Sequence, residues 1–172
     1  RGIENMKLIF ISGPSGSGKT TLSKIIREKI KHSIIISTDN YYKTGFVSII
    51  LSKFVEGYFD RRISLNYKQL KKDIRFIIQN GFLDSLRSYN FNSKKITRFS
   101  IKPQNIKYLI IEGIFAREIL SIVDKKDYFF LKLKKNKQYC MNRVIERDFI
   151  ERGKAKKLAE KDFLKSWDIY YS

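Results

Sequence analysis

The chain has 172 residues, of which 42% are hydrophobic and 14% aromatic, so its composition favours one globular domain with a buried core and excludes a disordered chain. Its formal net charge is +19, and no apolar run approaches the roughly 20 residues that a membrane-spanning helix requires. The single cysteine, Cys140, excludes an internal disulfide and is typical of a reducing compartment, which predicts a cytoplasmic location.

The N-terminal region predicts a strand, a glycine-rich loop and a helix in direct succession. The apolar run 8–11 has the length of a buried strand, residues 13–20 read GPSGSGKT, and apolar residues at helical spacing follow over 21–30. This is a complete G-x-x-x-x-G-K-[ST] pattern, in which backbone N–H groups of the loop and the helix N-terminus converge on a phosphate. We therefore predict a nucleoside triphosphate site in which Lys19 reaches the β- and γ-phosphates and the Thr20 hydroxyl binds Mg²⁺.

Two acidic residues follow predicted buried strands. Asp39 comes after the strand 33–37, and Glu112 comes directly after the strand 106–111. In parallel α/β sheets ligands bind at the carboxyl ends of the strands, so both side chains are expected beside the glycine-rich loop. There, Asp39 can accept a proton from a substrate hydroxyl, and Glu112 has the position of an acidic metal-binding residue. From these residues alone, a helix-capping role for Asp39 and an ordinary loop position for Glu112 stay open.

The remaining segments continue the α/β pattern. Helices are predicted over 47–55, 66–79 and 137–151, a hairpin over 88–101, a strand over 128–133, and a last helix after the lysine-rich residues 154–157. In the hairpin Tyr89 and Phe91 lie on one side, and in the helix that follows the last strand Arg143 and Arg147 are one turn apart. Strands that alternate with helices predict a parallel sheet with right-handed crossovers.

These motifs occur in an order that resembles the uridine kinase (uridine/cytidine kinase) family of P-loop kinases. The matching stretches are GPSGSGKTT (13–21), STDNYY (37–42), YFDRRISLNYKQL (58–70), YNF (89–91), LIIEGIF (109–115) and RDFIERG (147–153). The resemblance implies a three-layer P-loop fold over residues 6–172, with a substrate hairpin near 88–101 and a lid near 147–160. It also implies transfer of the γ-phosphate of ATP or GTP to the 5′-hydroxyl of uridine or cytidine. Residues 1–5 precede Met6 and are interpreted as a remnant outside the domain.

The resemblance further implies roles for the matching residues. Asp39 would act as the base on the nucleoside 5′-hydroxyl, and Asp60 would bind the ribose hydroxyls. The catalytic set would be Asp39, Lys19 and Arg147, and the Mg²⁺ set Thr20, Asp39 and Glu112. The triphosphate would be bound by Gly13, Ser15, Gly16, Ser17, Gly18, Lys19, Thr20, Thr21 and Arg152. The substrate would be bound by Asp39, Tyr41, Phe59, Asp60, Tyr89, Phe91, Arg143 and Arg147.

The chain also departs from the family pattern. Phe59-Asp60 is followed by residues 61–63, which read RRI, where the family usually has His-Pro-Asp. Residues 92–95 contain no histidine, although the family usually has a histidine in this region that binds the pyrimidine base. The chain ends at Ser172, before the final strand and helix that the resemblance implies. These departures leave the base preference open.

Two alternatives therefore stay open. One is a P-loop kinase of another small alcohol, such as nicotinamide riboside or pantothenate. The other, motivated by the net charge of +19, is a nucleotide-dependent protein that binds nucleic acid. The lysines are scattered along the chain and form no single stripe, which favours a solvated basic surface over a nucleic-acid interface. We expect small-molecule partners and no membrane, and a homo-oligomer stays open.

Overall fold

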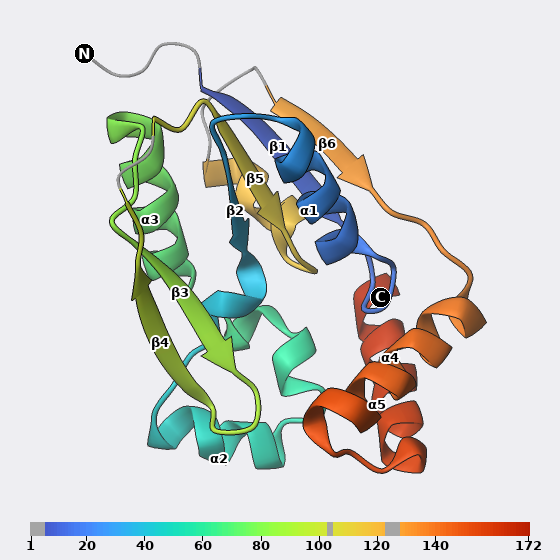
Figure 1. The fold of residues 1–172 in the computed structure, drawn as a ribbon. Coiled ribbons are helices and arrows are strands. Elements are labelled where there is room, and N and C mark those ends of the chain that lie inside the picture. The colour runs from blue at the N-terminus through green and yellow to red at the C-terminus, as the bar shows by residue number, and fades with distance from the viewer. Residues whose placement is uncertain (1–5, 103–104, 123–127) are drawn as a thin grey trace.

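The computed structural model describes residues 6–102, 105–122 and 128–172, so the expectation for residues 1–5 lies outside the described residues. Figure 1 shows the strands, the helices and the short 3-10 helices labelled η. In chain order they are β1 (Lys7–Ser12), α1 (Lys19–Lys29), β2 (Ser33–Ser37), η1 (Thr38–Tyr41), α2 (Phe46–Phe54), η2 (Tyr58–Asp60), η3 (Arg62–Ser64), α3 (Tyr67–Asn80), β3 (Ser85–Asn90), β4 (Lys95–Ser100), β5 (Tyr108–Glu112), η4 (Ala116–Ile122), β6 (Tyr128–Lys132), α4 (Lys137–Arg152) and α5 (Lys156–Tyr171).

The described residues form a parallel sheet with the strand order β2-β5-β1-β6. In the register of this sheet, Glu112 at the end of β5 is opposite both Ile11 of β1 and Ser37 of β2. The carboxyl ends of these three strands therefore meet at one edge, from which the glycine-rich loop and the segment that carries Asp39 both continue. The predicted parallel α/β sheet is confirmed.

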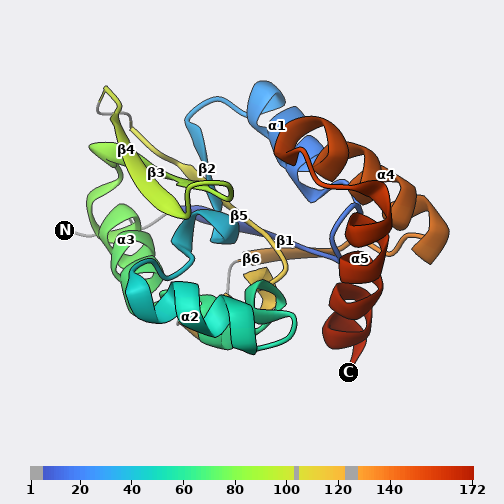
Figure 2. The ribbon, with the colours of Figure 1, turned by 90° about the horizontal axis from the view of Figure 1, so that it is seen from below.

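Alternate residues of β1 pack on opposite faces of the sheet. Leu8 and Phe10 belong to the larger hydrophobic cluster, which also contains the buried face of α3. Ile9 and Ile11 face the other way and pack against the apolar side of α1. Figure 2 shows this arrangement, with α1 on one side of the sheet and α3 on the other. Each fully buried aliphatic or aromatic side chain contributes about 1.5–3 kcal/mol relative to exposure, so the two clusters hold the sheet edge in place.

The helix boundaries follow local capping signals. Asn66 caps α3 by accepting a hydrogen bond from the backbone N–H of Gln69 at 3.1 Å, and Gly81 ends the helix with φ 72°. Helix α2 also lies within one residue of its predicted bounds. The hairpin differs from its predicted bounds of 88–101, because β3 begins at Ser85, which pairs with Ser100 at the end of β4. The residues added at its start, 85–87, read SLR, a run too short to mark a strand by its alternation.

The last two helices, α4 and α5, pack as an antiparallel pair at the same end of the sheet as the glycine-rich loop (Figure 1). Cys140 and Val144 of α4 are buried against Phe163 of α5, which confirms the expected structural position of the cysteine. Gly153 ends α4 with φ 62°, so the chain turns into α5 within the lysine-rich segment. Within the described ranges, no helix combines the length and apolar character that crossing a bilayer demands.

Candidate functional site

The phosphate loop, residues 13–20, connects β1 to α1 and needs glycine at defined positions. Gly16 and Gly18 have φ angles of 79° and 96°, which L-amino acids with a side chain rarely adopt. A Cβ on Gly16 would also overlap the carbonyl oxygen of Cys140 and lie 3.0 Å from its carbonyl carbon. The loop therefore packs directly on α4, and its backbone conformation depends on these glycines.

Lys19 begins α1 at the end of this loop. Its side chain is buried, and its Nζ donates a hydrogen bond to the carbonyl oxygen of Pro14 at 2.9 Å, back across the loop. Burial lowers the pKa of the Lys19 ammonium, and the nearby charges of Asp39 and Glu112 oppose this shift while that of Arg147 adds to it. Asp39, Glu112 and Arg147, which come from separate elements, are therefore close enough to change the pKa of Lys19.

Gly113 allows the end of β5 and η1 to approach each other, and the charges of Glu112 and Asp39 interact across this approach. Gly113 has φ 140°, and a Cβ there would overlap the Thr38 hydroxyl oxygen. Glu112 is almost fully buried, and its Oε2 accepts a hydrogen bond from the Thr20 hydroxyl at 3.4 Å. Burial raises the pKa of the Glu112 carboxyl, and the charge of Asp39 raises it further. Both carboxylates therefore lie at the sheet edge beside the phosphate loop, since Glu112 ends β5 and Asp39 lies in η1, directly after β2.

The oxygens at this edge suit Mg²⁺. In the described part of the chain, Asp39 Oδ1 is buried without a hydrogen-bond partner, and Thr20 and Glu112 are in contact. No group of three or more His, Cys, Asp or Glu side chains that could enclose a metal occurs in that part. Mg²⁺ in kinases is typically held by one or two protein oxygens, with water and phosphate oxygens completing the octahedron. The donor set therefore fits a magnesium–nucleotide complex rather than an all-protein metal cage.

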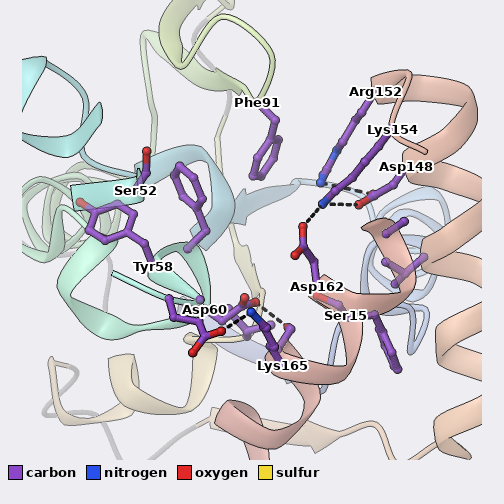
Figure 3. A pocket seen from close by; sticks show the side chains of 18 of the residues that line it. Ser15, Ser52, Tyr58, Asp60, Phe91, Asp148, Arg152, Lys154, Asp162 and Lys165 are labelled. Atoms are coloured by element: carbon purple, nitrogen blue, oxygen red, sulfur yellow. Dashed lines mark hydrogen bonds and ion pairs between the residues drawn. The ribbon is translucent and has the colours of Figure 1, made fainter. Parts of the chain in front are cut away.

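An open cavity of about 590 Å³ lies beside the phosphate loop. Its walls come from the loop, η1, η2, the α2–η2 connection, the turn of the β3–β4 hairpin, α4 and α5 (Figure 3). The volume is in the range of small-molecule sites. We call it the acceptor cavity. The predicted site residues that line it are Ser15, Asp39, Phe59, Asp60, Phe91, Arg147 and Arg152.

Four aromatic rings form one side of the acceptor cavity and its support. Tyr42, Phe59, Tyr89 and Phe91 pack edge to face, with ring centroids as close as 5.1 Å for Tyr89 and Phe91. Phe59, Phe91 and Tyr42 line the cavity, whereas Tyr89 is buried behind Phe91. From the hairpin turn, Lys94 lies over the Phe59 ring and donates to the Ser52 hydroxyl at 2.8 Å.

Other predicted residues lie outside the acceptor cavity. Tyr41 is buried on the opposite side of η1, where its hydroxyl donates to Asp73 of α3 at 2.9 Å, so the structure does not bring this side chain to the substrate. Arg143 lies beside the phosphate loop, with Nη1 3.3 Å from the place that a Cβ on Gly18 would take. Thr21 is an exposed residue in the first turn of α1, next to the loop.

Residues 147–160, the segment predicted to be a lid, bring two arginines to the cavity. Arg147 and Arg152 both line it, and the Arg152 guanidinium lies 4.1 Å from the centroid of the Phe91 ring. Burial lowers the pKa of Arg152, as does the charge of Arg147, and Asp148 opposes the shift. The resemblance implies that Arg152 binds the triphosphate, whereas in this structure its guanidinium contacts Phe91 in the turn of the β3–β4 hairpin.

Sequence reasoning missed several residues that complete the cavity. The Ser166 hydroxyl of α5 donates to Asp60 Oδ1 at 2.6 Å, and Lys165 forms an ion pair with Glu56. Burial raises the pKa of Asp60, and the hydrogen bond from Ser166 opposes this. No local pattern marks α5 as a wall of the cavity, because its contacts with Asp60 and Glu56 span more than a hundred residues of the chain.

Asp148 also lines the cavity, and the sequence contains a signal for it, because it follows Arg147 and lies four residues before Arg152.

Comparisons with known proteins match most of this chain to one family. The profile of the phosphoribulokinase / uridine kinase family matches residues 8–164. A uridine kinase of Borrelia duttonii is 32% identical over 168 residues, which cover 94% of this chain and 76% of that protein. Uridine-cytidine kinase C of Dictyostelium discoideum is 36% identical over 120 residues, covering 68% of this chain and 25% of that protein.

Solved structures agree on the fold. A kinase provisionally assigned to fructose transport from Silicibacter sp. TM1040 superposes with a TM-score of 0.73 at 14% identity, over 98% of this chain and 86% of that one. A structure described as a possible uridine kinase from Bacillus stearothermophilus gives a TM-score of 0.55 at 17% identity, over 88% of each chain. At these identities the likeness is one of fold.

Proposed function

The chain belongs to the phosphoribulokinase / uridine kinase family, and we propose that it transfers the γ-phosphate of ATP or GTP to the 5′-hydroxyl of uridine or cytidine, forming UMP or CMP. The observation that carries this proposal is the position of Asp39. Its carboxylate belongs both to the wall of the acceptor cavity and to the charged cluster around Lys19 and Glu112. A hydroxyl bound there would stand between the base and the phosphate loop.

Asp39 is the proposed base. Its Oδ1 is buried and free of hydrogen bonds in the described part of the chain, so it can accept a hydrogen bond from the acceptor hydroxyl and orient that hydroxyl for attack. Lys19 would leave Pro14 to contact the β- and γ-phosphates. Mg²⁺, when bound at Thr20, Asp39 and Glu112, would neutralise charge on the phosphate oxygens. In such transfers catalysis is mostly positioning and electrostatic stabilisation.

The acceptor cavity has groups for each part of a nucleoside. Asp60 is a carboxylate that can accept from two adjacent ribose hydroxyls, and Ser166 fixes the orientation of its side chain. Phe59 and Phe91 offer apolar ring surface against which a flat base can pack. Both the acceptor and the phosphate donor are small molecules. A cytoplasmic location remains our proposal, consistent with the single buried thiol.

Arg147 is the proposed lid residue for the transferred phosphate. A planar guanidinium can pair with two phosphate oxygens at once. Arg147 lies close enough to Lys19 for its charge to lower the pKa of the Lys19 ammonium. Arg143, beside Gly18, is the second cation that we assign to the triphosphate instead of to the nucleoside. Both arginines project from α4, so their positions depend on how this helix packs on the loop.

The proposal is tested by measuring ATP consumption with Mg²⁺ against uridine, cytidine, adenosine, guanosine, nicotinamide riboside and pantothenate. We expect turnover with uridine or cytidine, and its loss in Asp39→Asn. Asp84→Asn, at an exposed position before the hairpin, makes the same chemical change outside the cavity and should keep wild-type activity. Turnover with only one of the other acceptors would contradict the proposed substrate, and an active Asp39→Asn enzyme would contradict the proposed base.

A further inference from the structure

A buried carboxylate lies behind the two lid arginines. The side chain of Asp148 is only 5% exposed, and its Oδ1 accepts hydrogen bonds from Nε and Nη2 of Arg147 at 3.0 and 2.7 Å. The same oxygen is 3.3 Å from Nη1 of Arg152, and Oδ2 is 3.9 Å from Nζ of Lys154. Figure 3 shows Asp148, Arg152 and Lys154 gathered on the lid side of the cavity.

The backbone of Asp148 is held at the same place. Its carbonyl oxygen accepts from the N–H of Lys154 at 3.0 Å, across the left-handed Gly153 that ends α4. Main chain and side chain of this one residue therefore tie the end of α4 to the turn that follows. The carboxylate itself is restrained by its burial and by its bonds to three cations, so the groups bonded to it are held near the end of α4.

The two arginines that share this carboxylate reach different parts of the cavity. Arg147 lines the cavity together with Ser15 of the phosphate loop, and its charge lowers the pKa of Lys19. The Arg152 guanidinium lies 4.1 Å from the centroid of the Phe91 ring, in the turn of the β3–β4 hairpin. Asp148 itself lines the same cavity, on the far side from Asp60 in Figure 3.

Without this carboxylate the arginines would take other partners. Two guanidiniums at such close range repel each other, and an arginine side chain has several rotatable bonds. The other carboxylates that line the cavity are those of Asp39, Glu56, Asp60 and Asp162. The charge of Asp39 already acts on Arg152. A released arginine would pair with one of these carboxylates, the proposed base among them, or turn to solvent. Either change would remove it from the phosphate.

We propose that Asp148 is a positioning residue for phosphoryl transfer, whose buried carboxylate orients Arg147 toward the phosphate loop and keeps Arg152 away from Asp39. Its proposed role is exercised through the two arginines and not through a bond to the reacting atoms. The inference rests on the proposed kinase function for its kinetic readout, but its binding readout does not depend on which alcohol accepts the phosphate.

The test compares Asp148→Asn with Asp168→Asn. Asp168 pairs with Lys137 at 3.7 Å on the same helix pair but is 75% exposed, so its variant is the matched control. For Asp148→Asn we expect kcat to fall by roughly 100-fold, as misplacement of about 1 Å at a reacting group can cause. Affinity for a non-hydrolysable ATP analogue with Mg²⁺, measured by calorimetry, should also fall by roughly 10-fold, while Asp168→Asn changes neither value.

A double-mutant cycle distinguishes a role that acts through Arg147 from a purely structural role. If Asp148 acts through Arg147, Asp148→Asn should add little to the loss already seen in Arg147→Ala, whereas independent structural damage would add in full. Asp148→Glu keeps the charge and supplies a second folded variant, and it should recover part of kcat. Unchanged kcat and unchanged analogue affinity in the folded Asp148→Asn protein would overturn the inference. If Asp148→Asn binds the analogue more weakly than the wild type and the wild type phosphorylates no nucleoside, the inference is supported and the proposed function is refuted instead.

Discussion

Replacing Gly113 by alanine should separate the two carboxylates of the site. A Cβ at this position would overlap the Thr38 hydroxyl oxygen and lie 3.0 Å from Thr38 Cβ, and the backbone is held at φ 140°. A non-glycine residue in such a conformation costs about 1–3 kcal/mol. Overpacking against a buried neighbour costs about 1–3 kcal/mol more, so we expect Gly113→Ala to lower the free energy of unfolding by about 2–6 kcal/mol.

The functional effect follows from which segment must move. Relief of the overlap requires η1 to move away from β5, and η1 carries Asp39. We expect kcat to fall by roughly 100-fold while the triphosphate still binds, because the phosphate loop is not displaced. Urea denaturation and steady-state kinetics measure the two effects on the same preparations.

The matched control is Gly45→Ala. Gly45 also has a positive φ, 99°, but a Cβ there meets nothing within 4 Å, so only the backbone conformation contributes to its cost. In a Thr38→Ala background the overlapping hydroxyl is absent, and Gly113→Ala should then cost less than in the wild type. The reasoning is refuted if Gly113→Ala is no more destabilising than Gly45→Ala, or if removal of the Thr38 hydroxyl changes nothing.

Three further predictions concern individual side chains. Asp60→Asn should raise KM for uridine by roughly 10-fold with a smaller change in kcat, since a neutral amide is a weaker acceptor for ribose hydroxyls, and an unchanged KM would contradict the ribose assignment. Tyr41→Phe should leave KM for uridine unchanged and lower the free energy of unfolding by about 1 kcal/mol, because its hydroxyl donates to Asp73 and not to the cavity; a raised KM would contradict this placement. The pKa of the Glu112 carboxyl is raised, so the folded protein keeps this carboxyl protonated to a higher pH than the unfolded chain does, whose value is near 4.5. Without Mg²⁺ the free energy of unfolding should therefore fall as the pH rises through that raised pKa. Glu112→Gln should remove that pH dependence while abolishing turnover, and pH-dependent urea denaturation would show whether it does.

The glycine pattern and the acidic strand ends were predictable because their physical cause is local. A phosphate loop needs glycines with positive φ at fixed spacing, and parallel strands bring their carboxyl ends to one edge whatever the details of packing. Asp39 and Glu112 therefore meet where the sequence indicates. Lys19 starts the helix that the pattern requires.

The directions of single side chains were not predictable in the same way. Tyr41 and Tyr42 are adjacent in the sequence, and the turn η1 sends Tyr42 to the cavity and Tyr41 to α3. Four residues of 3-10 helix are too short for a pattern to fix which side faces the core. The hydrogen bond from Ser166 to Asp60 depends on how α5 packs, and local sequence has no information about a partner 106 positions away.

The most direct test of the central claim identifies the phosphorylated product. The wild-type protein is incubated with ATP, Mg²⁺ and either uridine or cytidine, and the product is analysed by mass spectrometry before and after periodate treatment, which cleaves an intact 2′,3′-diol. We predict a nucleoside monophosphate that periodate cleaves, and no product with Asp39→Asn, because the phosphate is on the 5′-oxygen and Asp39 orients that hydroxyl. A periodate-resistant monophosphate, or transfer to neither pyrimidine nucleoside while another alcohol is phosphorylated, would contradict the account.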